Sequence, residues 1–217
     1  LVPIPPTLCR TVELAITGYY THSPAIRELE IYGETEKPAT PQPKPTGIAD
    51  GLYQTDRSLA YARGGTTLWR LNTDPKEGKP YMHPLRLPNG DVLTALRPAD
   101  HVWHRALWFS WKFINGVNYW EENKKTGLSD GRTTLASSTA TAAEDGSATS
   151  DSQLEYHPPD GPVVLRETRS ITISPPEADG SYRIDWAATF AAGNTEVKLS
   201  RTPLPPDPGG AKHGGYA

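Results

Sequence analysis

From residue 51 onward, the pattern of apolar and polar positions predicts an all-β fold. Short runs alternate with a period of two residues, as strands with one buried face do, and no window shows a helical apolar stripe longer than two turns. Dipeptides that favour tight hairpin turns separate the runs. They are Asn89-Gly90, Asn115-Gly116, Asp130-Gly131, Asp145-Gly146, Asp160-Gly161 and Asp179-Gly180. The sequence therefore predicts an antiparallel β-sandwich.

Two segments give clear strand predictions. In residues 182–190 large apolar side chains alternate with small or polar ones, so one face of this strand is expected to be buried. Residues 135–152 contain enough alanine for a weak helix. Their Ser and Thr content and the Asp145-Gly146 dipeptide favour a strand–turn–strand hairpin instead.

The first fifty residues differ from the rest of the chain. Residues 10–33 hold only two short strand-like runs, which cannot bury a core of their own. Their closing phrase, SPAIRELEIYG, resembles the end of a discoidin (F5/8 type C) sandwich. The following residues are rich in proline, which is typical of an extended linker. We therefore expect a discoidin-like remnant over 1–33, a linker over 34–50, and a sandwich domain over 51–217 that is truncated at its C-terminus.

Composition and charge exclude several classes of function. The 22 Lys and Arg residues nearly balance 25 Asp and Glu residues, so no basic field is expected to hold nucleic acid. The apolar runs are far shorter than the ~20 residues that a membrane-spanning helix needs. The single cysteine, Cys9, excludes an intrachain disulfide and a cysteine-based metal site. We predict neither nucleic-acid binding nor membrane insertion.

Residues 97–123 concentrate the side chains suited to chemistry, including four of the six tryptophans. Suppose that residues 107–113 form a strand and that the chain turns back at Asn115-Gly116 in a type I′ turn. Residues of the two strands then face each other in pairs whose numbers sum to 231, such as Phe113 and Asn118. One face of this hairpin is expected to pack on the core; it carries Leu107, Phe109, Trp111, Phe113 and Trp120. The other face is expected to be open; it carries Trp108, Ser110, Lys112, Tyr119 and Glu121, with His104 on the same side.

The open face combines aromatic rings with ionisable groups. Rings can cover the apolar face of a pyranose, while Lys, Glu and Ser side chains bond its hydroxyl groups. We therefore predict that Trp108, Lys112 and Tyr119 bind a sugar. The structural alternative is that Trp108 and Tyr119 pack beneath a loop or the second sheet of the sandwich.

Asp100, His101 and His104 precede the predicted strand. Two histidines three residues apart converge only on a turn or a helix-like loop, and the preceding Pro98 favours such a loop. They could supply a general acid and base, with Asp100 fixing a histidine tautomer. They could also bind a metal, or simply cap a turn. Arg105 either holds a substrate carboxylate or pairs with a nearby acid.

Two phrases, KPYMHPLRLPNGDVLT at 79–94 and RPADHVWHRALWFSWKFINGVNYWEE at 97–122, resemble a bacterial family labelled PmoA-like. The resemblance runs from about Gly51 to the C-terminus. It implies a large, galactose-mutarotase-like β-sandwich in secreted or periplasmic proteins of polysaccharide-degrading bacteria. The family label also implies copper-dependent methane oxidation in a membrane, which the short apolar runs contradict.

Matched position by position, the family's marked residues fall on His83, Asp100, His101, His104, Arg105, Asn118 and Trp120. Two positions depart from the family pattern. Val102 replaces a proline, which leaves the loop less rigid, and Trp103 replaces a third histidine found in many members, which weakens the metal hypothesis.

Together these inferences predict a carbohydrate-active, secreted or periplasmic protein whose partner is an oligo- or polysaccharide. As an epimerase- or lyase-like enzyme it would use no cofactor. Its predicted catalytic residues are His101, His104, Asp100 and, as a reserve acid, Glu121; its predicted substrate-binding residues are His83, Arg105, Trp108, Lys112 and Tyr119. One alternative is a non-catalytic carbohydrate-binding or cell-surface module. The other is an oxidative enzyme with a single Cu, Fe or Zn ion on His83, His101 and His104.

Overall fold

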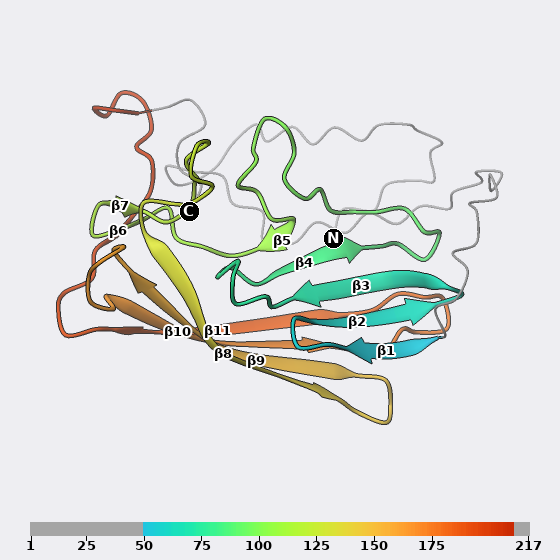
Figure 1. Cartoon of the computed structure of the whole chain (residues 1–217). Coiled ribbons are helices and arrows are strands. Elements are labelled where there is room, and N and C mark those ends of the chain that lie inside the picture. Colours follow the sequence, from blue (N-terminus) through green and yellow to red (C-terminus); the bar gives the residue numbers. More distant parts are fainter. Residues whose placement is uncertain (1–49, 211–217) are drawn as a thin grey trace, which may run out of the picture. The chain divides into compact units, whose positions relative to one another are not determined.

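A computed structural model describes residues 50–210, and every regular element in this range is a β-strand (Figure 1). The strands form three antiparallel sheets. The first sheet contains, in spatial order, β1 (Gly51–Gln54), β2 (Ser58–Arg63), β3 (Thr66–Asn72), β4 (Tyr81–Leu85) and β5 (Leu107–Trp108). The second sheet contains β11 (Ile184–Ala192), β10 (Leu165–Ile173), β9 (Ala148–His157) and β8 (Arg132–Ala142). The third sheet contains β12 (Leu199–Ser200), β6 (Phe113–Ile114) and β7 (Val117–Asn118).

The predicted all-β, sandwich-like fold is confirmed, because the second sheet packs its inner face on both other sheets. Towards the first sheet the buried cluster is Leu59, Leu68, Trp69, Leu71, Met82, Leu85, Ala148, Ile171 and Ile173. Towards the third sheet it is Ile114, Tyr119, Leu135, Leu154, Tyr156 and Leu165. The described residues contain no helix that could cross a membrane. The predicted remnant over 1–33, and the linker over 34–50 apart from Asp50, lie outside the described residues.

A buried ion pair lies between these two clusters on β10. Both carboxylate oxygens of Glu167 accept hydrogen bonds from Arg169, at 2.6 and 2.9 Å, and the Tyr156 hydroxyl donates a third at 2.6 Å. The Arg169 guanidinium lies 4.8 Å from the centre of the Trp186 ring. Burial, together with the Glu167 charge, raises the pKa of Tyr156 well above its ordinary value. The sandwich therefore has a polar centre whose charges are paired.

Four of the six predicted turn dipeptides lie between neighbouring antiparallel strands: Asn115-Gly116, Asp145-Gly146, Asp160-Gly161 and Asp179-Gly180. β8 and β9 form the strand–turn–strand unit around Asp145-Gly146, where Gly146 has a φ of 86°. At Asn115-Gly116 both residues have positive φ, 51° and 80°, as a type I′ turn requires. The predicted pairing of Phe113 with Asn118 is present. These features depend on local backbone chemistry, which the sequence shows directly.

The predicted continuous strand over 107–113 is wrong. β5 pairs with β4 in the first sheet, whereas β6 pairs with β12 in the third, and residues 109–112 belong to neither ladder. Side chains alternate between the two faces only along an unbroken strand, so the predicted assignment of residues to faces does not continue across residues 109–112. Trp108, Lys112 and Tyr119 are buried, with 9%, 9% and 0% exposure, so the face expected to be open is closed.

Candidate functional site

The loop 97–106 carries the Asp-His motif and lies in the connection from β4 to β5, two strands of the first sheet. Two consecutive turns shape it: His101 N donates to Pro98 O at 3.0 Å, and His104 N donates to His101 O at 2.8 Å. Arg97 N donates to His104 O at 2.8 Å and so closes the loop. The prediction that the histidine pair lies on a turn is confirmed, because His101 and His104 begin and end one turn.

Asp100 and His101 are exposed in this loop, and Trp103 is half-buried. The Asp100 and His101 side chains are 78% and 57% exposed, and Asp100 Oδ2 lies 3.0 Å from His101 Nδ1. The hydrogen bond with His101 lowers the pKa of the Asp100 carboxyl. An ionised carboxylate only accepts hydrogen bonds, so Nδ1 carries the proton and Nε2 is the basic nitrogen. The Trp103 ring lies 5.3 Å from the His101 ring.

The inner side of the same loop holds nitrogen atoms without hydrogen-bond partners. Three consecutive residues supply them: Trp103 Nε1, His104 Nδ1 and Arg105 Nε are buried and unpartnered. The His104 ring meets the Trp108 ring edge-on, with centroids 6.3 Å apart. Buried polar atoms of this kind normally bond water or a ligand. These three nitrogens therefore have no hydrogen-bond partner within the described residues.

A network of ion pairs holds the loop in place. Arg105 Nη2 donates to Glu122 Oε1 at 2.8 Å, and Arg105 Nη1 bonds Glu77. Arg97 Nη1 donates to Glu122 Oε2 at 2.9 Å. Arg105 and Glu122 are both buried, so each charge depends on its partners for compensation. The network connects the two ends of the loop to segments distant in the sequence.

Lys79 lies beside this network. Its Nζ donates to Ser129 Oγ at 2.7 Å and lies 5.5 Å from the centre of the Trp108 ring. Burial lowers the pKa of Lys79 to about 8, with Glu122 opposing the shift. The Trp108 and Trp120 ring centroids lie 4.5 Å apart, with the two ring planes tilted by 33°. A buried aromatic and cationic layer thus supports the loop.

Arg105 is not placed as a substrate-carboxylate ligand. Its two terminal nitrogens are bonded to Glu77 and Glu122, so the alternative, that it pairs with nearby acids, is confirmed. The predicted sugar contacts of Trp108, Lys112 and Tyr119 required exposed side chains, and their burial contradicts that premise. The physical reason is the break in the strand at 109–112, which turns these side chains inward.

Glu121 is held by two side chains outside the loop. It forms an ion pair with Lys112 and accepts a hydrogen bond from Asn118. Although partial burial opposes the shift, these two partners hold the pKa of Glu121 below its ordinary value. Asn118 also accepts bonds from the backbone N–H of Trp120 and Glu121, at 2.9 and 3.2 Å. Glu121 is thus an ionised carboxylate, which suits a reserve acid poorly.

His83 is held by a different neighbour. Its Nδ1 lies 2.9 Å from Thr94 Oγ1, and burial and Arg86 lower the pKa of its imidazole. In residues 50–210, no three His, Cys, Asp or Glu side chains are grouped as a metal site. The set His83, His101 and His104 is therefore not assembled as metal ligands.

Sequence reasoning missed Glu77, Lys79, Arg97 and Glu122. One signal was available, because Glu77 and Lys79 are two residues apart and would share a face of an extended segment. Glu122 was passed over for Glu121 on the basis of a register that does not extend that far. Their grouping depends on contacts across the fold, such as Glu77 with Arg105, 28 residues apart.

An aromatic cluster at the margin of the core was also missed. Phe109, Trp111 and Phe190 contact one another, with ring centroids 5.4 to 5.7 Å apart, and all three are half-buried. Phe109 and Trp111 were predicted to face the core. Trp111 does pack against the buried cluster around Ile114 and Tyr119, as does Phe190 on β11, so the prediction is confirmed for Trp111. Phe109 contacts both of these rings.

Comparison with known proteins gives a family but no function. A model described as a family of unknown function (DUF6807) matches residues 58–217. No curated protein and no solved structure matches the chain. The resemblances to PmoA-like and discoidin-like proteins stay predictions.

Proposed function

The chain belongs to this family of unknown function, and we propose that it is a carbohydrate-active protein whose loop 97–106 carries the reactive group. One observation supports this assignment above others: Asp100 holds His101 at 3.0 Å on an exposed loop beside Trp103. The pairing orients a basic imidazole towards solvent, and the indole offers a surface for a sugar ring.

In this proposal His101 acts as the general base and acid. In a lyase step, its Nε2 takes a proton from a ring carbon, a C=C bond forms as the neighbouring C–O bond breaks, and the departing oxygen takes that proton, while Asp100 keeps Nδ1 protonated. In an epimerase step, a second group returns a proton to the opposite face of the carbon. His104 lines the inner side of the loop, where its unpartnered Nδ1 can bond a substrate hydroxyl. The chemistry is that of an epimerase or a lyase acting on an oligo- or polysaccharide, in the secreted or periplasmic location that the family resemblance implies.

The test is turnover across a broad panel of oligo- and polysaccharides, followed by product analysis by NMR. We expect His101→Ala to lower the rate by about 10²- to 10⁴-fold, the usual contribution of general acid–base catalysis. Glycan affinity should stay within about tenfold, since the Trp103 platform is kept. His157→Ala is the matched control, because this imidazole is held by Thr134 and Pro158 and lies on β9. An active His101→Ala enzyme would refute the assignment.

A second function, a non-catalytic carbohydrate-binding module, is favoured by the aromatic cluster of Phe109, Trp111 and Phe190. The three rings contact one another and are only half-buried, so the parts of them that the core does not cover suit stacking on sugar rings without catalysis. If the unmodified protein turns over nothing in the panel but binds a glycan, and Trp111→Ala abolishes that binding, this second function is the correct one.

A further inference from the structure

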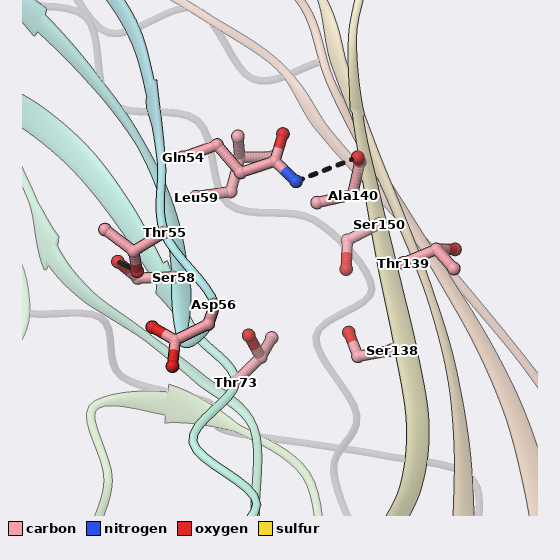
Figure 2. Close-up of a pocket in the computed structure, with 10 residues that line it drawn as sticks. All are labelled: Gln54, Thr55, Asp56, Ser58, Leu59, Thr73, Ser138, Thr139, Ala140 and Ser150. Carbon is pink, nitrogen blue, oxygen red and sulfur yellow. Dashed lines mark hydrogen bonds between the residues drawn. The ribbon is translucent and has the colours of Figure 1, made fainter.

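A cleft that shares no residue with the loop 97–106 lies between the first and second sheets (Figure 2). It opens between the β1–β2 turn and β8, which is the outer strand of the second sheet. Its volume is about 290 Å³, and its lining residues are Gln54, Thr55, Asp56, Ser58, Leu59, Thr73, Ser138, Thr139, Ala140 and Ser150. This size lies at the lower limit for ligand pockets, roughly 300 Å³, and suits one small molecule rather than a polymer.

The chemistry of the lining selects a neutral ligand. Most lining side chains carry a hydroxyl or an amide, and no Lys, Arg or His is among them. Asp56 is the one ionisable lining residue; its side chain is 82% exposed and pairs with Arg57 at 3.4 Å, so it stands at the rim. Hydroxyl groups both donate and accept hydrogen bonds, which matches a ligand that is itself rich in hydroxyls.

Ser150 supplies an unused hydrogen-bonding group. The residue is only 2% exposed, and its Oγ has no hydrogen-bond partner. In Figure 2 the hydroxyls of Ser150 and Ser138 face the space between β8 and the β1–β2 turn. The Gln54 amide crosses the cleft and donates to Ala140 O at 3.2 Å. Leaving a buried hydroxyl unpaired costs free energy, so a ligand that bonds Ser150 gains affinity.

We propose that this cleft binds one neutral polyhydroxylated molecule, a single sugar or sugar-alcohol unit, with Ser150 as its buried anchor. The site shares no residue with the loop 97–106 and does not depend on the function proposed above.

The experiment uses glucose, galactose and myo-inositol as probes at millimolar concentration, with binding to the full chain followed by saturation-transfer NMR. At least one probe should bind. Ser150→Ala should weaken its binding about three- to tenfold, the usual worth of one hydrogen bond. Ser138→Val should abolish binding, since an apolar branched side chain replaces a hydroxyl in the cleft wall.

The matched control is Ser110→Ala. Ser110 is equally buried, but its Oγ already donates to Tyr119 O at 3.2 Å and it does not line the cleft, so probe affinity should not change. Urea unfolding shows that each variant is folded; Ser150→Ala loses no partner and should be as stable as the parent. The proposal is overturned if no probe binds, or if binding survives both cleft variants. It also fails if His101→Ala, rather than Ser150→Ala, removes the binding, because the probe then occupies the loop.

Discussion

Ala106, at the end of the loop, has a backbone conformation that glycine would adopt more easily. Its φ is 65°, in the left-handed region, where an L side chain costs roughly 1–2 kcal/mol. Glycine removes that cost but adds about 0.5–1 kcal/mol of unfolded-state entropy. We therefore expect Ala106→Gly to raise the free energy of unfolding by about 0.5–1 kcal/mol. For a chain of 217 residues this corresponds to an increase in Tm of about 1–4 °C.

The assay is urea and thermal unfolding of the full chain, followed by tryptophan fluorescence. Ala188→Gly is the matched control, because Ala188 is exposed in the middle of β11 and is not among the residues with positive φ. This control should lose about 0.5–1 kcal/mol, the usual cost of glycine within a strand. If Ala106→Gly has the same urea midpoint as the parent, or a lower one, the argument from backbone strain is wrong.

Two further predictions concern the ionic network. The folded-state pKa of Lys79 is about 8, below its ordinary 10.5, so the unfolded chain binds more protons between these values and stability rises with pH there. Between about pH 7.5 and about pH 9.5, the free energy of unfolding of the parent should rise by about 2 kcal/mol more than that of Lys79→Met, as measured by urea unfolding. If the free energy of unfolding depends on pH equally in both proteins, the lowered pKa of a buried Lys79 is contradicted. Glu122→Ala should cost roughly 3–5 kcal/mol, because it leaves buried Arg105 with Glu77 alone. Glu122→Gln should recover part of this loss, and a loss below about 1 kcal/mol in both variants would show that the network contributes little.

The chemistry of the Asp-His loop could be predicted only in part. The turn at His101 and His104 and the pairing of Asp100 with His101 concern residues close in sequence, and local geometry decides them. The partners of Arg105 come from elsewhere, since Glu77 precedes it by 28 residues and Glu122 follows it by 17. The two-residue spacing of Glu77 and Lys79 is the one local signal for Glu77, and no local pattern distinguishes Glu122 from the other acidic residues of the chain.

The sequence by itself determined several of the strands and hairpin turns, and through them the all-β class. Period-two alternation and the positive φ that Asn-Gly and Asp-Gly tolerate are properties of neighbouring residues, and they were sufficient for β8, β9 and the turn at Asn115-Gly116. Only the tertiary structure decided which face of residues 107–121 is buried. That choice depends on which sheet each short strand joins, and β5 and β6 join different sheets. Side-chain parity does not carry across such a break, so Trp108 and Lys112 are buried where an unbroken strand would have exposed them.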